Sequence, residues 1–127
     1  LLVAAHRYRE FRAFAARLIF ACSFAAQSRG SDLYAKKQFL RAAAYFDLAI
    51  AACEEGLPRE KYLYFSRACA AAASGDKKRA LSFLAEAVDK GFSDLGLIET
   101  ARALDPIRDA PAYRALLARI KKTGTQY

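Results

Sequence analysis

The side chains that could do acid–base or nucleophilic chemistry are few in this sequence, and they are widely spaced. His6 is the sole histidine, and the paired carboxylates Glu54 and Glu55 are expected at a helix end, where water would solvate them. No serine stands in the Gly-x-Ser-x-Gly pattern of a nucleophile elbow, and there is no glycine-rich phosphate loop. We therefore predict that the protein is not an enzyme and that it uses no cofactor.

Three cysteines, Cys22, Cys53 and Cys69, could still bind a metal or form a disulfide. They lack the C-x-x-C spacing of zinc sites, and no second histidine can complete a ligand set, so no metal site is predicted. Because each lies in an alanine-rich run, we expect Cys53 and Cys69 to be small buried apolar side chains. A disulfide between those two would require an oxidising compartment, and their spacing does not decide it.

The elements that carry these residues are predicted to be helices. The chain has 127 residues, the size of one domain, and 29 of them are alanine, the best helix former. The β-branched residues that strands favour, Val, Ile and Thr, together number 10, and only 6 Gly and 3 Pro interrupt the alanine-rich runs. The composition therefore predicts an all-α protein.

The charge of the chain is strongly positive but dispersed. There are 21 Lys and Arg against 13 Asp and Glu, a formal net charge of +8, and the densest cluster is only Lys77-Lys78-Arg79. Nucleic-acid-binding proteins combine a basic stripe with a recognisable motif, and the sequence contains no such motif. We expect solvated helix faces to account for most of these charges, and we predict no nucleic-acid partner.

Residues 1–25 differ from the rest of the chain. A basic stretch comes first, a run of nine mostly apolar or small residues (18–26) follows, and polar residues come next. The basic residues are Arg7, Arg9, Arg12 and Arg17, opposed only by Glu10. This order is typical of a secretory signal peptide, with Ser23 and Ala25 at the positions that a signal peptidase reads. We expect cleavage after Ala25, export to the periplasm or cell envelope, and a net charge of +5 for the remainder.

Two alternatives stay open for this segment. In a lipoprotein Cys22 would be acylated, although the bulky Phe20 fits that motif poorly. Without cleavage, the segment would be an amphipathic helix that packs on the next helix. Its broad apolar face would contain Phe11, Phe14, Leu18 and Phe24. A retained segment would leave the protein in the cytoplasm or attach it to a membrane, although nine apolar residues are too few to span a bilayer.

The middle of the chain contains a repeat. Residues 30–50 align with residues 68–88 at a constant offset of 38, through alanines and large apolar residues. The aligned pairs are Gly30 with Ala68, Ala42 with Ala80, Phe46 with Leu84, and Ala49 with Ala87. This pattern is expected of two antiparallel helix pairs, because small residues let two helix backbones approach closely and a large residue fills the groove one turn later. We therefore predict that these eight residues pack between helices.

Turn signals separate the predicted helices. Ser74-Gly75-Asp76 offers a glycine that can adopt a positive φ at a helix end and an aspartate that can cap the next helix. The first pair has the weaker turn signal Lys36-Lys37-Gln38, and Pro58 lies where a third helix can begin.

These repeats resemble the tetratricopeptide repeat. The first has Gly30-x-x-Leu33-Tyr34 before its turn and Ala42-x-x-x-Phe46 after it, and the second, with its core at residues 75–88, is more similar still. The resemblance implies a short α-solenoid of antiparallel helix pairs with C-terminal capping helices. It places repeat one at about 24–56, repeat two at about 58–91, a capping tail at 92–122 and a short tail at 123–127, with residues 26–122 as the domain.

The capping tail is expected to cover the apolar end of the solenoid. Ser93 or Asp94 would cap a short helix holding Leu95, Leu97, Ile98 and Leu104. Asp109 and Pro111 would begin a last helix, whose apolar face would contain Tyr113, Leu116, Leu117 and Ile120.

The resemblance also implies a concave surface that binds a protein or peptide. Carried over position by position, its groove residues would be Gln27, Ser31, Tyr34, Tyr62, Phe65 and Cys69. The Lys and Asn pattern with which some relatives bind a C-terminal carboxylate is missing here. We therefore expect a non-catalytic scaffold or adaptor that binds a protein or peptide, and self-association into a homo-oligomer would complete its short core. The alternative is a membrane-attached assembly factor held by its N-terminal segment.

Overall fold

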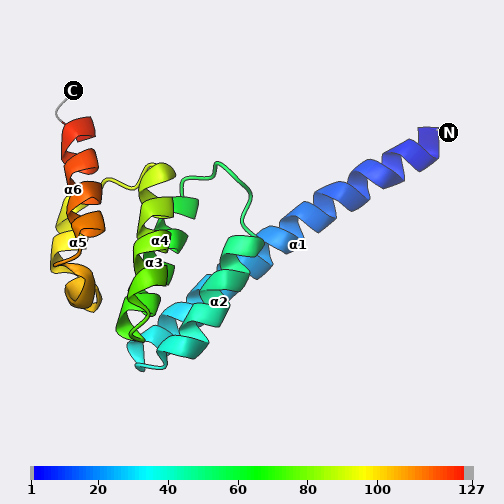
Figure 1. Cartoon of the computed structure of the whole chain (residues 1–127). Coiled ribbons are helices and arrows are strands. Elements are labelled where there is room, and N and C mark those ends of the chain that lie inside the picture. The colour runs from blue at the N-terminus through cyan, green and yellow to red at the C-terminus, as the bar shows by residue number, and fades with distance from the viewer. Residues whose placement is uncertain (1, 125–127) are drawn as a thin grey trace.

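A computed structural model describes residues 2–124 of the chain, and the prediction of an all-α protein is confirmed for them (Figure 1). These residues form seven helices and no strand. In chain order the helices are α1 (Leu2–Ala35), α2 (Phe39–Ala51), α3 (Glu60–Ala73), α4 (Lys77–Asp89), α5 (Leu95–Thr100), the 3-10 helix η1 (Arg102–Ile107) and α6 (Pro111–Gly124). The predicted tail at 123–127 begins inside α6, and residues 125–127 lie outside the described part.

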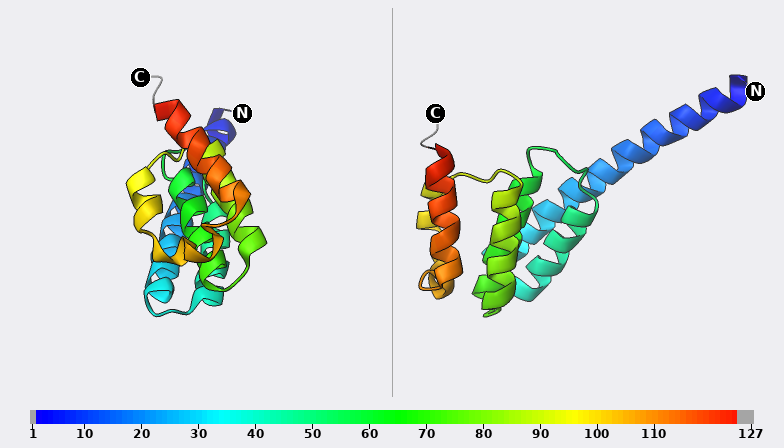
Figure 2. Two further views of the ribbon diagram at one scale, coloured as in Figure 1. Left: turned by 60° about the vertical axis from the view of Figure 1, so that its left-hand side comes forward. Right: turned by 45° about the horizontal axis from the view of Figure 1, so that its top comes forward.

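The helices are arranged as two consecutive antiparallel pairs. The C-terminal half of α1 lies beside α2, α3 lies beside α4, and α2 also packs on α3 (Figure 1). The elements α5, η1 and α6 lie on the far side of the second pair, away from α1 and α2 (Figure 2). The chain therefore proceeds in one direction from pair to pair, with the capping elements at its C-terminal end.

Small residues sit at the contacts between the paired helices. The eight residues aligned in the two repeats are all buried: Gly30, Ala42, Phe46, Ala49, Ala68, Ala80, Leu84 and Ala87. The closest approach lies at Gly30, where an added Cβ would be 2.8 Å from Cε1 of the Phe46 ring. A methyl group at residue 30 would therefore force the buried Phe46 ring to shift from its packed position.

The turns that join the paired helices share one backbone geometry. Gly75 has a φ of +91°, and Asp76 accepts a hydrogen bond from the Arg79 amide at 3.1 Å, as the sequence predicts. In the first turn Lys37 takes the corresponding position with a φ of +62°, the only non-glycine residue with positive φ among those described. Side chains disfavour this conformation by about 1–2 kcal/mol, so the weak turn signal of the sequence corresponds to a strained turn.

The capping tail is built around Arg108. Its guanidinium donates to the Tyr113 hydroxyl at 2.7 Å, to the Asp105 carboxylate at 2.7 Å and to the backbone carbonyl of Ala101 at 2.8 Å. It also reaches the carbonyls of Ile98 and Glu99, at the end of α5. A hydrogen bond to Asp105 raises the pKa of Arg108, which is charged at any physiological pH. One side chain thus joins α5, η1 and α6.

The helix ends in the tail follow the sequence, with one exception. Asp94 caps α5 by accepting from the Leu97 amide at 3.0 Å, and Pro111 is the first residue of α6. Tyr113, Leu116 and Ile120 are buried on α6, and Leu117 is partly buried. The prediction that Leu104 shares a helix with the residues of α5 is wrong, because the backbone is extended at Ala101 and Leu104 lies in η1.

The N-terminal half of α1 projects beyond the rest of the molecule (Figure 1). The first buried residue within the described range 2–124 is Ser23, whose hydroxyl donates to the Ala49 carbonyl at 2.7 Å. The packing expected if the segment is an extra helix is not found, because its four apolar side chains, Phe11, Phe14, Leu18 and Phe24, are all more than half exposed. Cleavage after Ala25, as in the signal-peptide prediction, would divide α1 and remove Ser23.

A first test concerns the close contact at Gly30. Gly30→Ala should lower the free energy of unfolding by about 1–2 kcal/mol. Overpacking a core costs about 1–3 kcal/mol, and the higher helix propensity of alanine offsets up to about 1 kcal/mol of that cost. The matched control is Gly96→Ala in α5, where the added Cβ would meet only Asp94 Oδ1 at 3.5 Å. Urea unfolding should show the control unchanged or stabilised, and Phe46→Leu should partly rescue Gly30→Ala. Equal stability of the two alanine variants would contradict the contact.

A second test concerns the strained turn. Lys37→Gly should raise the free energy of unfolding by about 0.5–1 kcal/mol, because glycine adopts a positive φ without a steric penalty and loses part of that gain to chain entropy. Lys36→Gly, one residue earlier and without positive φ, should give no gain. Thermal melting of the two variants beside the wild type measures the difference, and a stabilised Lys36→Gly would show that the effect is not the φ of residue 37.

Candidate functional site

A pocket of about 240 Å³ lies between α1, α3 and the connection from α5 to η1. Its lining residues are Ser31, Tyr34, Phe46, Phe65, Ser66, Cys69 and Ala101. Four of the six groove residues predicted from the sequence are therefore brought together: Ser31 and Tyr34 from α1, and Phe65 and Cys69 from α3. The structure adds Phe46 from α2, Ser66 from α3 and Ala101.

Ring contacts hold two walls of this pocket in place. Tyr34 meets the ring of Phe39 edge to face, with the ring centroids 5.3 Å apart, across the turn between α1 and α2. Phe65 stacks on Phe92, with centroids 4.6 Å apart and the ring planes 8° from parallel. Because Phe92 is buried and follows α4, the pocket wall on α3 is braced by the second helix pair.

The pocket is apolar and uncharged. Its polar atoms are the hydroxyls of Ser31, Ser66 and Tyr34 and the thiol of Cys69, and no charged side chain is among the described residues that line it. Burial, followed by the nearby Cys69, raises the pKa of Tyr34 to about 12, and burial raises the pKa of Cys69 to about 12. Both groups are therefore neutral at physiological pH, and the thiol is a weak nucleophile there.

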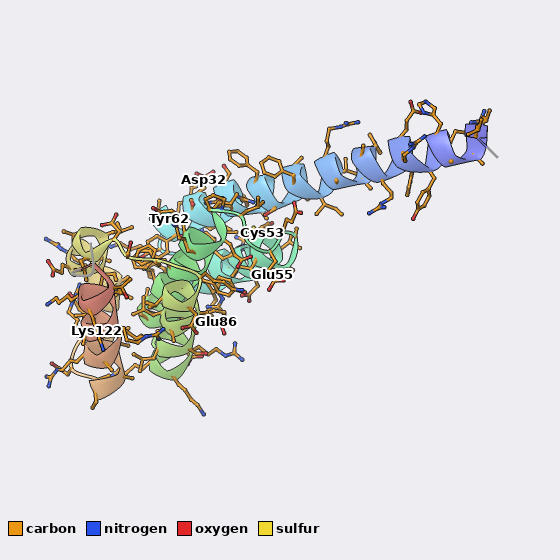
Figure 3. The ribbon with its side chains drawn as sticks, turned by 90° about the horizontal axis from the view of Figure 1, so that it is seen from above. Asp32, Cys53, Glu55, Tyr62, Glu86 and Lys122 are labelled. Atoms are coloured by element: carbon orange, nitrogen blue, oxygen red, sulfur yellow. The ribbon has the colours of Figure 1, made fainter. Side chains whose placement is uncertain are left out.

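The other two predicted groove residues lie outside the pocket. Gln27 accepts a hydrogen bond from Arg59 Nη2 at 2.6 Å, and Nη1 of the same guanidinium donates to Ser23 Oγ at 2.8 Å. Gln27 therefore helps to hold the connection between α2 and α3 against α1. Tyr62 is exposed on α3 and contacts the Phe92 ring edge to face at 5.6 Å (Figure 3).

All three cysteines are free thiols. Cys69 is buried, as predicted, but the expectation that Cys53 is buried is wrong: it is only partly buried, in the connection after α2 (Figure 3). Among the described residues, no group of three or more His, Cys, Asp and Glu side chains could hold a metal ion. The sole histidine, His6, contacts Glu10 at 3.0 Å on the projecting half of α1.

Two buried ionic groups were missed by the sequence reasoning. Arg67 on α3 is buried, with its Nε 2.7 Å from Asp47 Oδ1 on α2 and its guanidinium 4.5 Å from the centroid of the Phe83 ring on α4. Glu60, at the start of α3, is buried with Oε1 3.2 Å from Lys90 Nζ, and this carboxylate raises the pKa of Lys90. No sequence pattern distinguishes these charges from solvated ones, because their partners lie 20 or 30 residues away.

The cysteine environments predict an order of reactivity. At pH 8 in the folded protein, a thiol reagent should modify the exposed Cys22 first, Cys53 more slowly, and Cys69 only after unfolding, because burial of Cys69 both shields its thiol and suppresses the thiolate. Time-resolved colorimetric titration with mass spectrometry measures this order. Cys22→Ser should remove the fast phase alone, and in denaturant all three thiols should react. Fast modification of Cys69 in the folded protein would show that the pocket wall is open.

No protein-family model, no curated protein and no solved structure matches this chain. The resemblance to the tetratricopeptide repeat therefore depends on the residues and spacing of the sequence itself. For the function, the pocket and the surfaces around it are the physical basis.

Proposed function

We propose that the protein is a non-catalytic protein-interaction module, a tetratricopeptide-like scaffold or adaptor that binds a protein or peptide partner through the pocket between α1, α3 and Ala101. The observation that carries this proposal is the pocket itself: about 240 Å³, apolar, uncharged and lined by Tyr34 and Phe65. Small-molecule sites are typically about 300–1,000 Å³, so this pocket suits one anchoring side chain of a larger partner better than a whole ligand.

The chemistry of the lining favours an apolar anchor. An aliphatic or aromatic side chain of the partner would contact the rings of Tyr34, Phe46 and Phe65, and the hydroxyls of Ser31 and Ser66 would bond to its backbone. A charged side chain would lose its hydration without meeting an opposite charge, which costs several kcal/mol. Buried aromatic anchors of this kind contribute most of the binding energy in many interfaces.

Three observations support the solenoid part of the proposal. The helices form consecutive antiparallel pairs, small residues at corresponding positions of the two pairs are buried, and a capping segment held by Arg108 covers the second pair. Two repeats and a cap make a short solenoid, so docking on a larger partner or a second copy would add to its core.

Catalysis is less consistent with this site than binding. Among the described residues that line the pocket, the thiol of Cys69 has a raised pKa of about 12 that keeps it protonated. No His, Asp, Glu or Lys side chain is among these lining residues to activate the hydroxyls of Ser31, Ser66 and Tyr34. The pocket also lacks the positive side chains that a phosphate backbone needs, which disfavours a nucleic-acid strand as the partner. Export of the protein remains part of the proposal, and N-terminal sequencing of the cellular protein tests it.

The proposal is tested by filling the pocket. Ala101→Phe should block it without disturbing a helix, because residue 101 has an extended backbone, with φ −76° and ψ 99°, which a phenylalanine adopts without strain. Peptides selected from a displayed random library on the wild-type protein should bind this variant at least about tenfold more weakly.

The control variant is Ala112→Phe, which adds the same ring at an exposed position of α6. Both variants should melt at the wild-type temperature, and the control should keep the wild-type affinity. If the peptides bind Ala101→Phe as tightly as the wild type, they use another surface and the pocket is not the site. Selected peptides without an enriched apolar residue would contradict the proposed anchor.

A further inference from the structure

The N-terminal part of α1, residues 2–24, exposes many large apolar side chains to water. Nine large apolar side chains from this stretch are more than half exposed: Leu2, Val3, Tyr8, Phe11, Phe14, Leu18, Ile19, Phe20 and Phe24. The helix that carries them projects from the body of the protein (Figure 1), and its side chains extend in several directions around it (Figure 3). A stretch of this size that is exposed to water indicates an interaction surface.

Part of this surface forms one face along the projecting half of the helix. An α-helix turns about 100° per residue, so Phe11 and Phe14 lie within about 40° of Leu18 around the helix. The buried residues of α1, Ser23, Ala26, Gly30 and Leu33, lie about 60–140° from Leu18. A flat surface could contact Phe11, Phe14 and Leu18 beyond the helix pairs, because this part of α1 projects from the body (Figure 1). Phe20 is on the other side, where the Arg59 guanidinium lies 5.7 Å from its ring centroid.

The charges beside this face are almost all positive. The segment carries Arg7, Arg9, Arg12 and Arg17, and its one carboxylate, Glu10, is already in contact with His6 at 3.0 Å. By the same 100° rotation, Arg12 and Arg17 lie about 120° and 100° from Leu18, on opposite sides of the helix. Arg7, one turn before Phe11, lies about 20° from Leu18, at the N-terminal end of the apolar face. A second copy of this helix would bring like charges together, whereas an anionic surface would neutralise them. The combination of an apolar face with flanking arginines matches helices that lie in the interface of an anionic membrane.

We propose that residues 2–22 of α1 bind an anionic lipid surface, lying in its interface with Phe11, Phe14 and Leu18 inserted and the arginines at the head groups. Among residues 2–124, no helix is long and apolar enough to cross a membrane, so contact is with the surface. The pocket then remains on the body, away from the lipid. This binding requires that residues 2–22 be retained, so it excludes cleavage after Ala25, and N-terminal sequencing of the cellular protein decides between the two. Lipid binding does not depend on the pocket, and the pocket and lipid proposals can fail separately.

The test is flotation of the purified 127-residue chain with vesicles. Vesicles of phosphatidylglycerol and phosphatidylcholine in equal parts should carry the protein upward, and vesicles of phosphatidylcholine alone should carry much less. Phe11→Ser with Leu18→Ser should lower the partition coefficient at least about tenfold, because both side chains lose their apolar burial. Arg12→Gln with Arg17→Gln should lower it roughly fivefold for each arginine, and added salt should have a similar effect.

Matched controls distinguish binding through this face from nonspecific binding of any exposed apolar side chain to the vesicles. Leu40→Ser with Leu48→Ser removes two leucines of α2 that are 77% and 55% exposed, and Phe20→Ser removes a ring from the other side of α1. These controls and the pocket variant Ala101→Phe should float like the wild type, and circular dichroism should show that all variants are folded.

Three results would overturn the proposal. They are equal flotation with neutral and anionic vesicles, an equal loss in the Leu40 and Leu48 control, and no flotation at all. If sedimentation then shows dimers that Phe11→Ser with Leu18→Ser dissociates, the face belongs to a second copy. If salt-sensitive binding to single-stranded DNA depends on the arginines but not on the two serine changes, the partner is a nucleic acid.

Discussion

The close approach of helix backbones is the constraint on which the rest of this structure depends. Between α1 and α2 it leaves no space for a methyl group at Gly30, and the contacts of the second pair are made by Ala68, Ala80 and Ala87. Alanine side chains bury little apolar area each, so stability must come from dispersion contacts over a long, tightly packed surface. The few large side chains, such as Phe46 and Leu84, then have defined holes to fill.

The same constraint explains where the structure is open. Small alanine side chains pack closely within each helix pair. Between the first pair and the C-terminal segment, the extended residue Ala101 is the nearest part of the connection from α5 to η1, and a pocket that Phe46 also lines remains there. Arg108 joins the end of α5 to Tyr113 of α6 and also binds the carbonyl of Ala101, so the edge of the pocket is fixed within this C-terminal segment. The apolar lining of the pocket is continuous with the core.

Buried ionic groups favour one register of the helices in a core that is otherwise made of similar small side chains. Arg67 links α2, α3 and α4 through Asp47 and the Phe83 ring, and Glu60 with Lys90 joins the start of α3 to the end of α4. Breaking such pairs leaves a buried charge without a partner, so alternative registers of the helices are penalised. In a chain with 29 alanines, where many registers have similar apolar contacts, this penalty favours one arrangement.

The projecting half of α1 has a different physical character from the body. Its helix continues the register that begins at Ser23, but its large apolar side chains are more than half exposed, and its arginines have one carboxylate among them. The body is held by contacts within the chain, whereas most side chains of this segment face water. The molecule therefore has two separate surfaces, an apolar pocket on the body and a basic helix with exposed apolar side chains that projects from it.

The sequence by itself determined that the chain is helical, because its alanine content is a local signal. It also placed Gly75 in a turn and Asp76 and Asp94 at helix caps, since these are local signals too. The 38-residue offset is a periodic signal, and it identified eight residues that are buried in the structure. The resemblance to the tetratricopeptide repeat named four of the residues that line the pocket, Ser31, Tyr34, Phe65 and Cys69. Only the tertiary structure decided that Gln27 and Tyr62 lie outside the pocket, that Ala101 closes it, that Lys37 adopts a positive φ, and that Arg67 and Glu60 are buried. These features depend on residues that are distant in the chain and meet only when the helices pack, and no local pattern encodes such a meeting.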